Sequence, residues 1–126
     1  MPFNLWGESL QYFKSNKRNT AMDKATIDEI IQYLKDHLIQ SGLNVDSIAL
    51  FGSALTGEMH QDSDIDLIII SSEFRNKDIF ERTQMTMKPE IATLKKCKVA
   101  MDILNLSPEE YADSIVKRYY DSKIVA

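Results

Sequence analysis

The sequence predicts a small α/β domain in which helices and strands alternate along the chain. Apolar runs of strand length occur at 47–51, 64–71 and 98–106. Apolar residues recur at helical spacing between these runs, and capping or turn residues separate the segments. With 126 residues and 44% hydrophobic content, the chain can bury one compact core. We therefore expect 23–126 to form a single domain and 1–22 to form a helical N-terminal extension.

The first helix of the domain is expected to begin at Thr26. Thr26 and Glu29 have the spacing of a capping box, in which two side chains satisfy free backbone amides at the helix start. Gly42 marks the end of this helix. One face carries the apolar residues that recur at helical spacing, namely Ile27, Ile30, Ile31, Leu34 and Leu38.

Two further helices are expected after the second strand. The first covers 76–87, and Pro89 should break or restart it, because proline has no amide hydrogen to donate. The second begins at Ser107, which forms a capping box with Glu110, and has proline at its first position. We expect it to continue to residue 119.

Two aspartates, Asp64 and Asp66, lie two residues apart in the second expected strand. Side chains alternate across a strand, so both carboxylates point to the same face. Two ionised carboxylates side by side on a largely buried strand repel each other and are costly to desolvate. A divalent cation relieves both effects, because hard cations prefer carboxylate oxygens. The alternative is that both aspartates lie in a solvated loop.

These aspartates complete a pattern that resembles the polymerase-beta-type nucleotidyltransferase superfamily. The pattern consists of Gly52-Ser53, then Ser63-Asp64-Ile65-Asp66, then Asp102 inside a third strand. It is most similar to the minimal nucleotidyltransferases, which are single small domains, and it extends from about residue 26 to about residue 111. The resemblance implies a small mixed β-sheet flanked by helices, the nucleotidyltransferase fold.

The resemblance also implies a reaction, in which an NMP group moves from an NTP to a hydroxyl, with AMP from ATP as the expected case. Two Mg²⁺ ions can hold the attacking and leaving oxygens together. Asp64, Asp66 and Asp102 would be the metal ligands and catalytic residues, with Asp102 as the base. The residues that would bind the nucleotide are Gly52, Ser53 and Ser63, because a glycine lets phosphate approach the backbone closely and a hydroxyl can donate to it.

The Gly-Ser loop departs from the family pattern. Many members carry an arginine between this Gly-Ser and the next glycine, whereas this chain has Ala54-Leu55-Thr56. Lys95, Lys96 and Lys98, before the third strand, can compensate for that charge or form an ordinary solvated turn. A Gly-Ser after a strand is, on its own, compatible with a simple turn.

Three functions are compatible with the pattern. Minimal nucleotidyltransferases commonly occur as antitoxins that adenylylate a tyrosine of a HEPN-type toxin, so the resemblance implies a partner protein as the acceptor. The alternatives are a small-molecule transferase of the aminoglycoside-modifying type and a non-catalytic module that binds a partner.

Composition narrows the partners further. A net charge of −4 argues against a nucleic-acid partner, which would favour a basic face. The single cysteine, Cys97, makes a reducing cytoplasm the expected location. No apolar stretch approaches the length of a membrane span. The aromatic residues within 1–22 would also allow a homo-oligomer to form.

Overall fold

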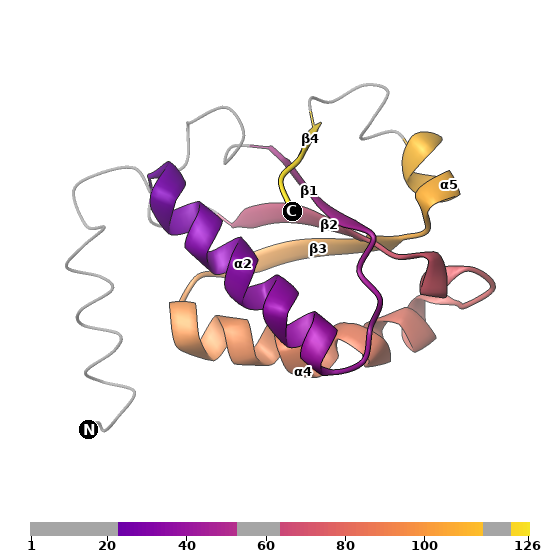
Figure 1. Cartoon of the computed structure of the whole chain (residues 1–126), viewed down its shortest axis with the longest axis horizontal. Coiled ribbons are helices and arrows are strands. Elements are labelled where there is room, and N and C mark those ends of the chain that lie inside the picture. Colours follow the sequence, from indigo (N-terminus) through magenta and orange to yellow (C-terminus); the bar gives the residue numbers. More distant parts are fainter. Residues whose placement is uncertain (1–22, 53–63, 115–121) are drawn as a thin grey trace.

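The computed structural model describes residues 23–52, 64–114 and 122–126. Within these ranges, four strands form one mixed sheet in the order β3-β2-β1-β4 (Figure 1). β2 pairs in parallel with β3, and β1 is antiparallel to both β2 and β4. The strands are β1 (Ser47–Phe51), β2 (Ile65–Ile70), β3 (Met101–Leu106) and β4 (Ser122–Ile124). The predicted fold class is confirmed, and β4 is a strand that the sequence patterns did not predict. The expected N-terminal extension, 1–22, lies outside the described residues.

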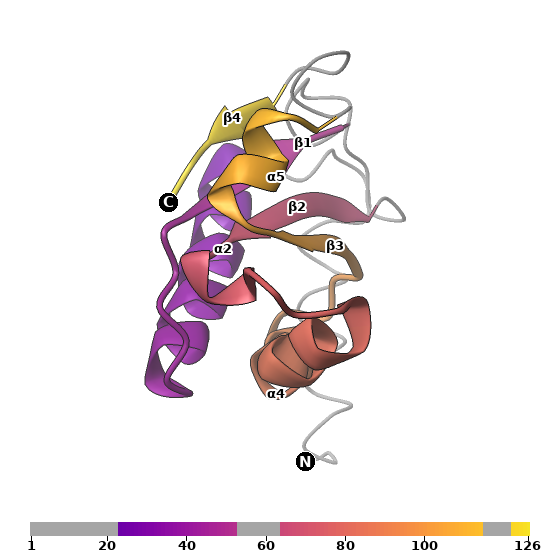
Figure 2. The ribbon, with the colours of Figure 1, turned by 90° about the vertical axis from the view of Figure 1, so that its right-hand side faces the viewer.

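Two long helices, α2 (Lys24–Gln40) and α4 (Ile79–Cys97), cover one face of the sheet (Figure 2). The main core lies between them and the inward-facing residues of β1 and β2, with Phe74 of a short 3₁₀ helix, η1 (Ser72–Phe74), fully buried in it. The opposite face carries a smaller apolar cluster that Tyr111 of α5 (Pro108–Ala112) contacts. The two faces of the sheet therefore have different coverings.

Helix α2 begins earlier than the capping-box spacing predicted. Its N-cap is Asp23, whose carboxylate accepts a hydrogen bond from the Thr26 amide at 2.8 Å. The prediction that Thr26 caps the helix is therefore wrong, because Asp23 is as good a cap and adds a turn to the helix. Gly42, just beyond the end of α2, has a φ of +102°. The predicted apolar face is confirmed, because its five residues are buried, namely Ile27, Ile30, Ile31, Leu34 and Leu38.

Helix α4 runs through Pro89 without interruption, so the predicted break there is wrong. The helix begins with a capping box between Asp78 and Glu81 and extends over 19 residues. Pro89 is buried, and the Thr93 hydroxyl donates to its carbonyl at 2.8 Å. Thr86 and Thr93, in the turns before and after Pro89, are fully buried, and burial of these turns outweighs the loss of one amide hydrogen bond at Pro89. The helix ends at Cys97, and the next residue, Lys98, has a φ of +57°. β3 begins at Met101, three residues later than expected.

The last described helix, α5, has the predicted capping box. The Ser107 side chain accepts from the Glu110 amide, and the Glu110 carboxylate accepts from the Ser107 amide. The helix ends at Ala112 rather than at residue 119, and 115–121 lie outside the described residues. Among the described helices, none combines the length and the apolar character that crossing a bilayer requires.

Candidate functional site

Two aspartates lie side by side on the neighbouring strands β2 and β3. In the parallel register of these strands, Asp66 is the direct partner of Asp102. Asp66 is partly buried and Asp102 is exposed. The residues on either side of Asp66, Ile65 and Leu67, pack into the main core with Ile103. Because side chains alternate, the two carboxylates emerge on the opposite face, away from α2 and α4.

Asp64 lies immediately before β2 and is exposed. It is electrostatically close enough to influence Asp66. Burial raises the pKa of Asp66 above its usual range, and the negative charges of Asp102 and then Asp64 raise it further. The three carboxylates thus form one electrostatic group, and any positive charge bound among them would favour the ionised form of Asp66.

Gly52 places the backbone directly against Asp66. It follows Phe51, which pairs with Asp66 in the β1–β2 ladder, and its φ is +73°. A Cβ atom at this position would lie 2.2 Å from Oδ2 of Asp66, well inside contact distance. Only glycine fits here without moving the carboxylate. The other two predicted nucleotide-binding residues, Ser53 and Ser63, lie outside the described residues, as do Ala54 to Thr56.

The chemistry of this donor set fits a hard divalent cation such as Mg²⁺. Carboxylate oxygens are the ligands that Mg²⁺ prefers, and it usually takes one or two of them together with water and substrate phosphates. As placed, no three or more Asp, Glu, His or Cys side chains in the described ranges lie close enough to enclose an ion by themselves. Asp64, Asp66 and Asp102 would therefore form an open site, completed by oxygens from elsewhere.

One group that anchors β3 at the end away from Asp102 was not predicted from the sequence. Arg82 of α4 donates to the Asn105 carbonyl in β3 at 2.9 Å and pairs with Glu110 of α5 at 2.7 Å. It thereby ties the end of β3 to both helices. No sequence motif marks Arg82, because its partners come from segments more than twenty residues away.

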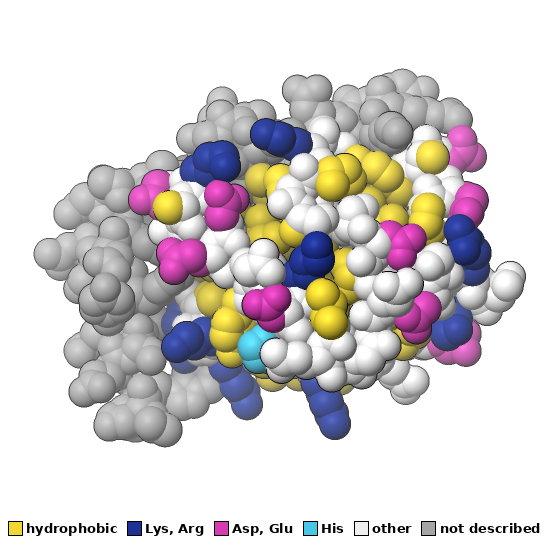
Figure 3. Space-filling model, viewed as in Figure 1, with side chains coloured by type: hydrophobic (Ala, Val, Ile, Leu, Met, Phe, Trp, Pro, Cys, Tyr) yellow, Lys and Arg dark blue, Asp and Glu magenta, His cyan; other side chains and the backbone are white. Residues whose placement is uncertain are grey.

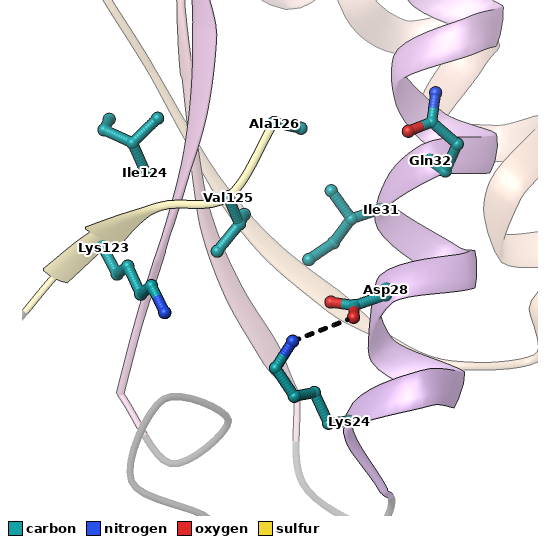
Figure 4. Close-up of a pocket in the computed structure, with 8 residues that line it drawn as sticks. All are labelled: Lys24, Asp28, Ile31, Gln32, Lys123, Ile124, Val125 and Ala126. Atoms are coloured by element: carbon teal, nitrogen blue, oxygen red, sulfur yellow. Dashed lines mark hydrogen bonds and ion pairs between the residues drawn. The ribbon is translucent and has the colours of Figure 1, made fainter.

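A hollow of about 260 Å³ lies between α2 and the C-terminal residues (Figure 4). Lys24 pairs with Asp28 at 3.1 Å on its rim, and Ile31 and Val125 contribute apolar surface. Hydrophobic side chains gather around β4 on this side of the molecule (Figure 3). Because Ile31 and Val125 belong to the main core or pack against it, this hollow lies on the helix-covered face, whereas Asp66 and Asp102 project from the other.

The comparisons with known proteins agree with this fold. The model of the family "Polymerase beta, Nucleotidyltransferase" matches residues 28–124, so the chain belongs to this family. None of the curated proteins matches the chain.

Among solved structures, a presumed nucleotidyltransferase from Sulfolobus solfataricus is 20% identical, with a TM-score of 0.54 over 82% of this chain and 87% of that one. A toxin-antitoxin structure with AMP-PNP is 21% identical, with a TM-score of 0.50 over 74% of this chain and 70% of that one. A third structure contains a tri-AMPylated Shewanella oneidensis HEPN toxin with its MNT antitoxin. The matching chain is 20% identical, with a TM-score of 0.46 over 83% of this chain and 72% of that one. The first two likenesses show the fold that this chain shares.

Proposed function

We propose that this protein is a metal-dependent nucleotidyltransferase that moves AMP from ATP to a hydroxyl on a partner protein. The observation that carries the proposal is the register of β2 and β3, which sets Asp66 directly beside Asp102. Asp64 adds a third charge to this pair, and Gly52 brings backbone against it. Membership of the nucleotidyltransferase family supports the same reaction.

In the proposed mechanism, Asp64, Asp66 and Asp102 would hold Mg²⁺. The bound metal would neutralise phosphate charge and orient the attacking and leaving oxygens. Asp102, exposed at the edge of the site, accepts the proton of the acceptor hydroxyl. The hydroxyl oxygen then forms a bond to the α-phosphorus while the bond to pyrophosphate breaks. The Gly52 backbone, with Ser53 and Ser63, binds the triphosphate.

A protein is the acceptor that we favour, specifically a hydroxyl on a HEPN-type toxin. Asp102 lies on an open face that a second protein can reach. One solved structure with the same fold is a toxin-antitoxin assembly that contains AMP-PNP. The family resemblance of the sequence favours a tyrosine as the modified residue.

We also infer that the reaction takes place in the cytoplasm, because the chain has one cysteine and no second one for an internal disulfide.

The direct test is transfer of label from ATP that carries ³²P at the α-phosphate. Purified protein, Mg²⁺ and a co-expressed HEPN-type partner should give a labelled partner whose mass rises by one AMP group. Asp66→Asn and Asp102→Asn should each lower the rate by about a thousandfold or more, because each removes a carboxylate from the centre of the reaction. Asp36→Asn, at an exposed site on α2, is the matched control and should leave the rate unchanged.

Other outcomes would favour the alternatives. Labelling of an aminoglycoside in place of any protein would indicate a small-molecule transferase. If a partner binds tightly, is never labelled, and binds Asp66→Asn equally well, the domain is a non-catalytic binding module. Calorimetric titration of the four NTPs with Mg²⁺ separates the non-catalytic module from both kinds of transferase, because only a working nucleotide site loses binding in Asp64→Asn/Asp66→Asn.

A further inference from the structure

The outer face of α4 carries an exposed apolar stripe, which consists of Phe80, Met87, Ile91 and Leu94. Phe80 is 78% exposed, and the other three are 44–46% exposed. Their spacings of seven, four and three residues place all four within an arc of about 60° on a helix with 3.6 residues per turn. The stripe extends over about 21 Å, at 1.5 Å per residue.

The fully enclosed positions of α4 are, by contrast, occupied by small or polar residues, and Met85 and Cys97 reach the main core only partly buried. Thr86 and Thr93 are fully buried, and Pro89 is buried between them. Figure 2 shows the helix end-on, with the sheet and α2 on one side and no described element on the other. The usual amphipathic pattern is therefore largely reversed, since most of the large apolar side chains of α4 are exposed to solvent. A stripe of this kind is typical of a surface that another helix covers.

The segment 1–22 carries a matching sequence pattern. Phe3, Trp6, Leu10 and Phe13 recur at spacings of three, four and three residues. In a helix they would form one apolar face about 15 Å long, which is shorter than the stripe on α4.

The chain connection lets this segment reach the stripe of its own molecule. The segment joins the domain at Asp23, the N-cap of α2. The beginning of α2 and the end of α4 lie at the same end of the molecule (Figure 1), and Ile27 and Cys97 contribute to one apolar cluster. The ten residues from Phe13 to Asp23 can span about 33 Å when extended, whereas a helix is only about 10 Å across.

We propose that the N-terminal segment folds as a helix and docks its aromatic face on the α4 stripe of the same molecule. This interaction goes beyond the proposed transfer reaction and is independent of it. The aromatic side chains of the N-terminal segment thereby cover the exposed apolar stripe of α4.

Trp6 is the single tryptophan of the chain and reports directly on this docking. The experiment measures the fluorescence emission maximum of Trp6 and its quenching by acrylamide in the full chain. Light scattering over a range of protein concentrations gives the molar mass and so identifies the monomer. We expect blue-shifted emission in the monomer and quenching several-fold weaker than that of a peptide of residues 1–22. Met87→Lys/Ile91→Lys should abolish both effects, because lysine retains helix propensity but removes the apolar surface. Ile124→Lys, at an exposed apolar site on β4 at the far edge of the sheet, is the matched control and should retain both.

Three results would overturn the proposal. The first is quenching of wild-type Trp6 at the rate of the free peptide, a measurement that requires no variant. The second is an equal loss of protection in Ile124→Lys. The third is protection that disappears as a dimer dissociates, which would assign the segment to the stripe of a second copy. Circular dichroism identifies any variant that fails to fold, and the wild-type measurement then decides.

Discussion

Replacing Gly52 by alanine adds a single methyl group where the end of β1 contacts Asp66. The change tests whether the backbone at this position sets the place of the carboxylate. Residue 52 has a φ of +73°, and its Cβ would lie 2.2 Å from Oδ2 and 3.1 Å from Cγ of Asp66. Ordinary contacts between such atoms lie at about 3.5 Å, so the carboxylate must move by about 1 Å.

Two contributions determine how far Gly52→Ala lowers the free energy of unfolding. Alanine in the left-handed region costs about 1–2 kcal/mol, and forcing the Asp66 side chain away from its rotamer adds about 1 kcal/mol. We therefore expect Gly52→Ala to lower the free energy of unfolding by about 2–3 kcal/mol. If the proposed reaction is correct, a carboxylate displaced by about 1 Å should also lower the transfer rate by about a hundredfold.

Urea unfolding followed by circular dichroism measures the first effect, and labelling of the partner measures the second. Gly42→Ala is the matched control, because Gly42 also has a positive φ, +102°, but an added Cβ meets no atom within 4 Å. It should lose stability through backbone strain alone and keep its transfer rate. In an Asp66→Ala background the clash is absent, so Gly52→Ala should cost about 1 kcal/mol less there than in the wild type.

The reasoning is refuted if Gly52→Ala costs the same with and without the Asp66 carboxylate. Equal activity of Gly52→Ala and the wild type, in a protein shown to transfer AMP, would refute the link between Gly52 and the position of Asp66.

Three further perturbations test other parts of the structure. Asp66→Asn should raise the urea midpoint of the metal-free protein at pH 7, because burial and like charges raise the pKa of Asp66 in the folded state. An acid with a raised folded pKa stabilises the fold only while it is protonated, so its contribution is lost as the pH rises through the folded pKa. Added Mg²⁺ should stabilise the wild type and not this variant. Glu110→Gln should cost about 0.5–1 kcal/mol in denaturant unfolding, because the hydrogen bond from Arg82 and then the Ser107 amide lower the pKa of Glu110. This contribution is present above a pH of about 4.3 and disappears as pH falls through the lowered pKa, so the variant should match the wild type in acid. Pro89→Ala should raise the thermal midpoint, with a net gain of about 1 kcal/mol, because the helix propensity gained exceeds the packing lost with the buried ring.

The sequence predicted those parts of the fold that depend on local periodicity. The apolar face of α2 and the strand at 47–51 follow directly from side-chain spacing. Helix ends were less predictable, because Asp23 and Thr26 are both good N-caps and only the folded helix selects one. The path of α4 through Pro89 depends on burial, which residue propensities do not include.

The candidate site was predictable one strand at a time. Alternation along β2 gives the face of Asp66, and alternation along β3 gives the face of Asp102, whereas Asp64, predicted to share the face of Asp66, lies just before β2. The register that sets Asp66 against Asp102 is a property of the assembled sheet, because a shift of one residue would turn Asp102 to the other face. The contact between Gly52 and Asp66 has the same origin, since it joins two strands.

Strand β2 is the most enclosed strand described, with hydrogen-bonded neighbours on both edges and four of its six residues at 0% exposure. Amides in such a strand exchange with solvent only when the whole domain opens. The carboxylate of Asp66 is therefore held by the part of the protein that unfolds last, in contrast to sites on mobile loops. Local fraying would leave its position unchanged, and on heating it should be displaced in the same cooperative transition that melts the sheet.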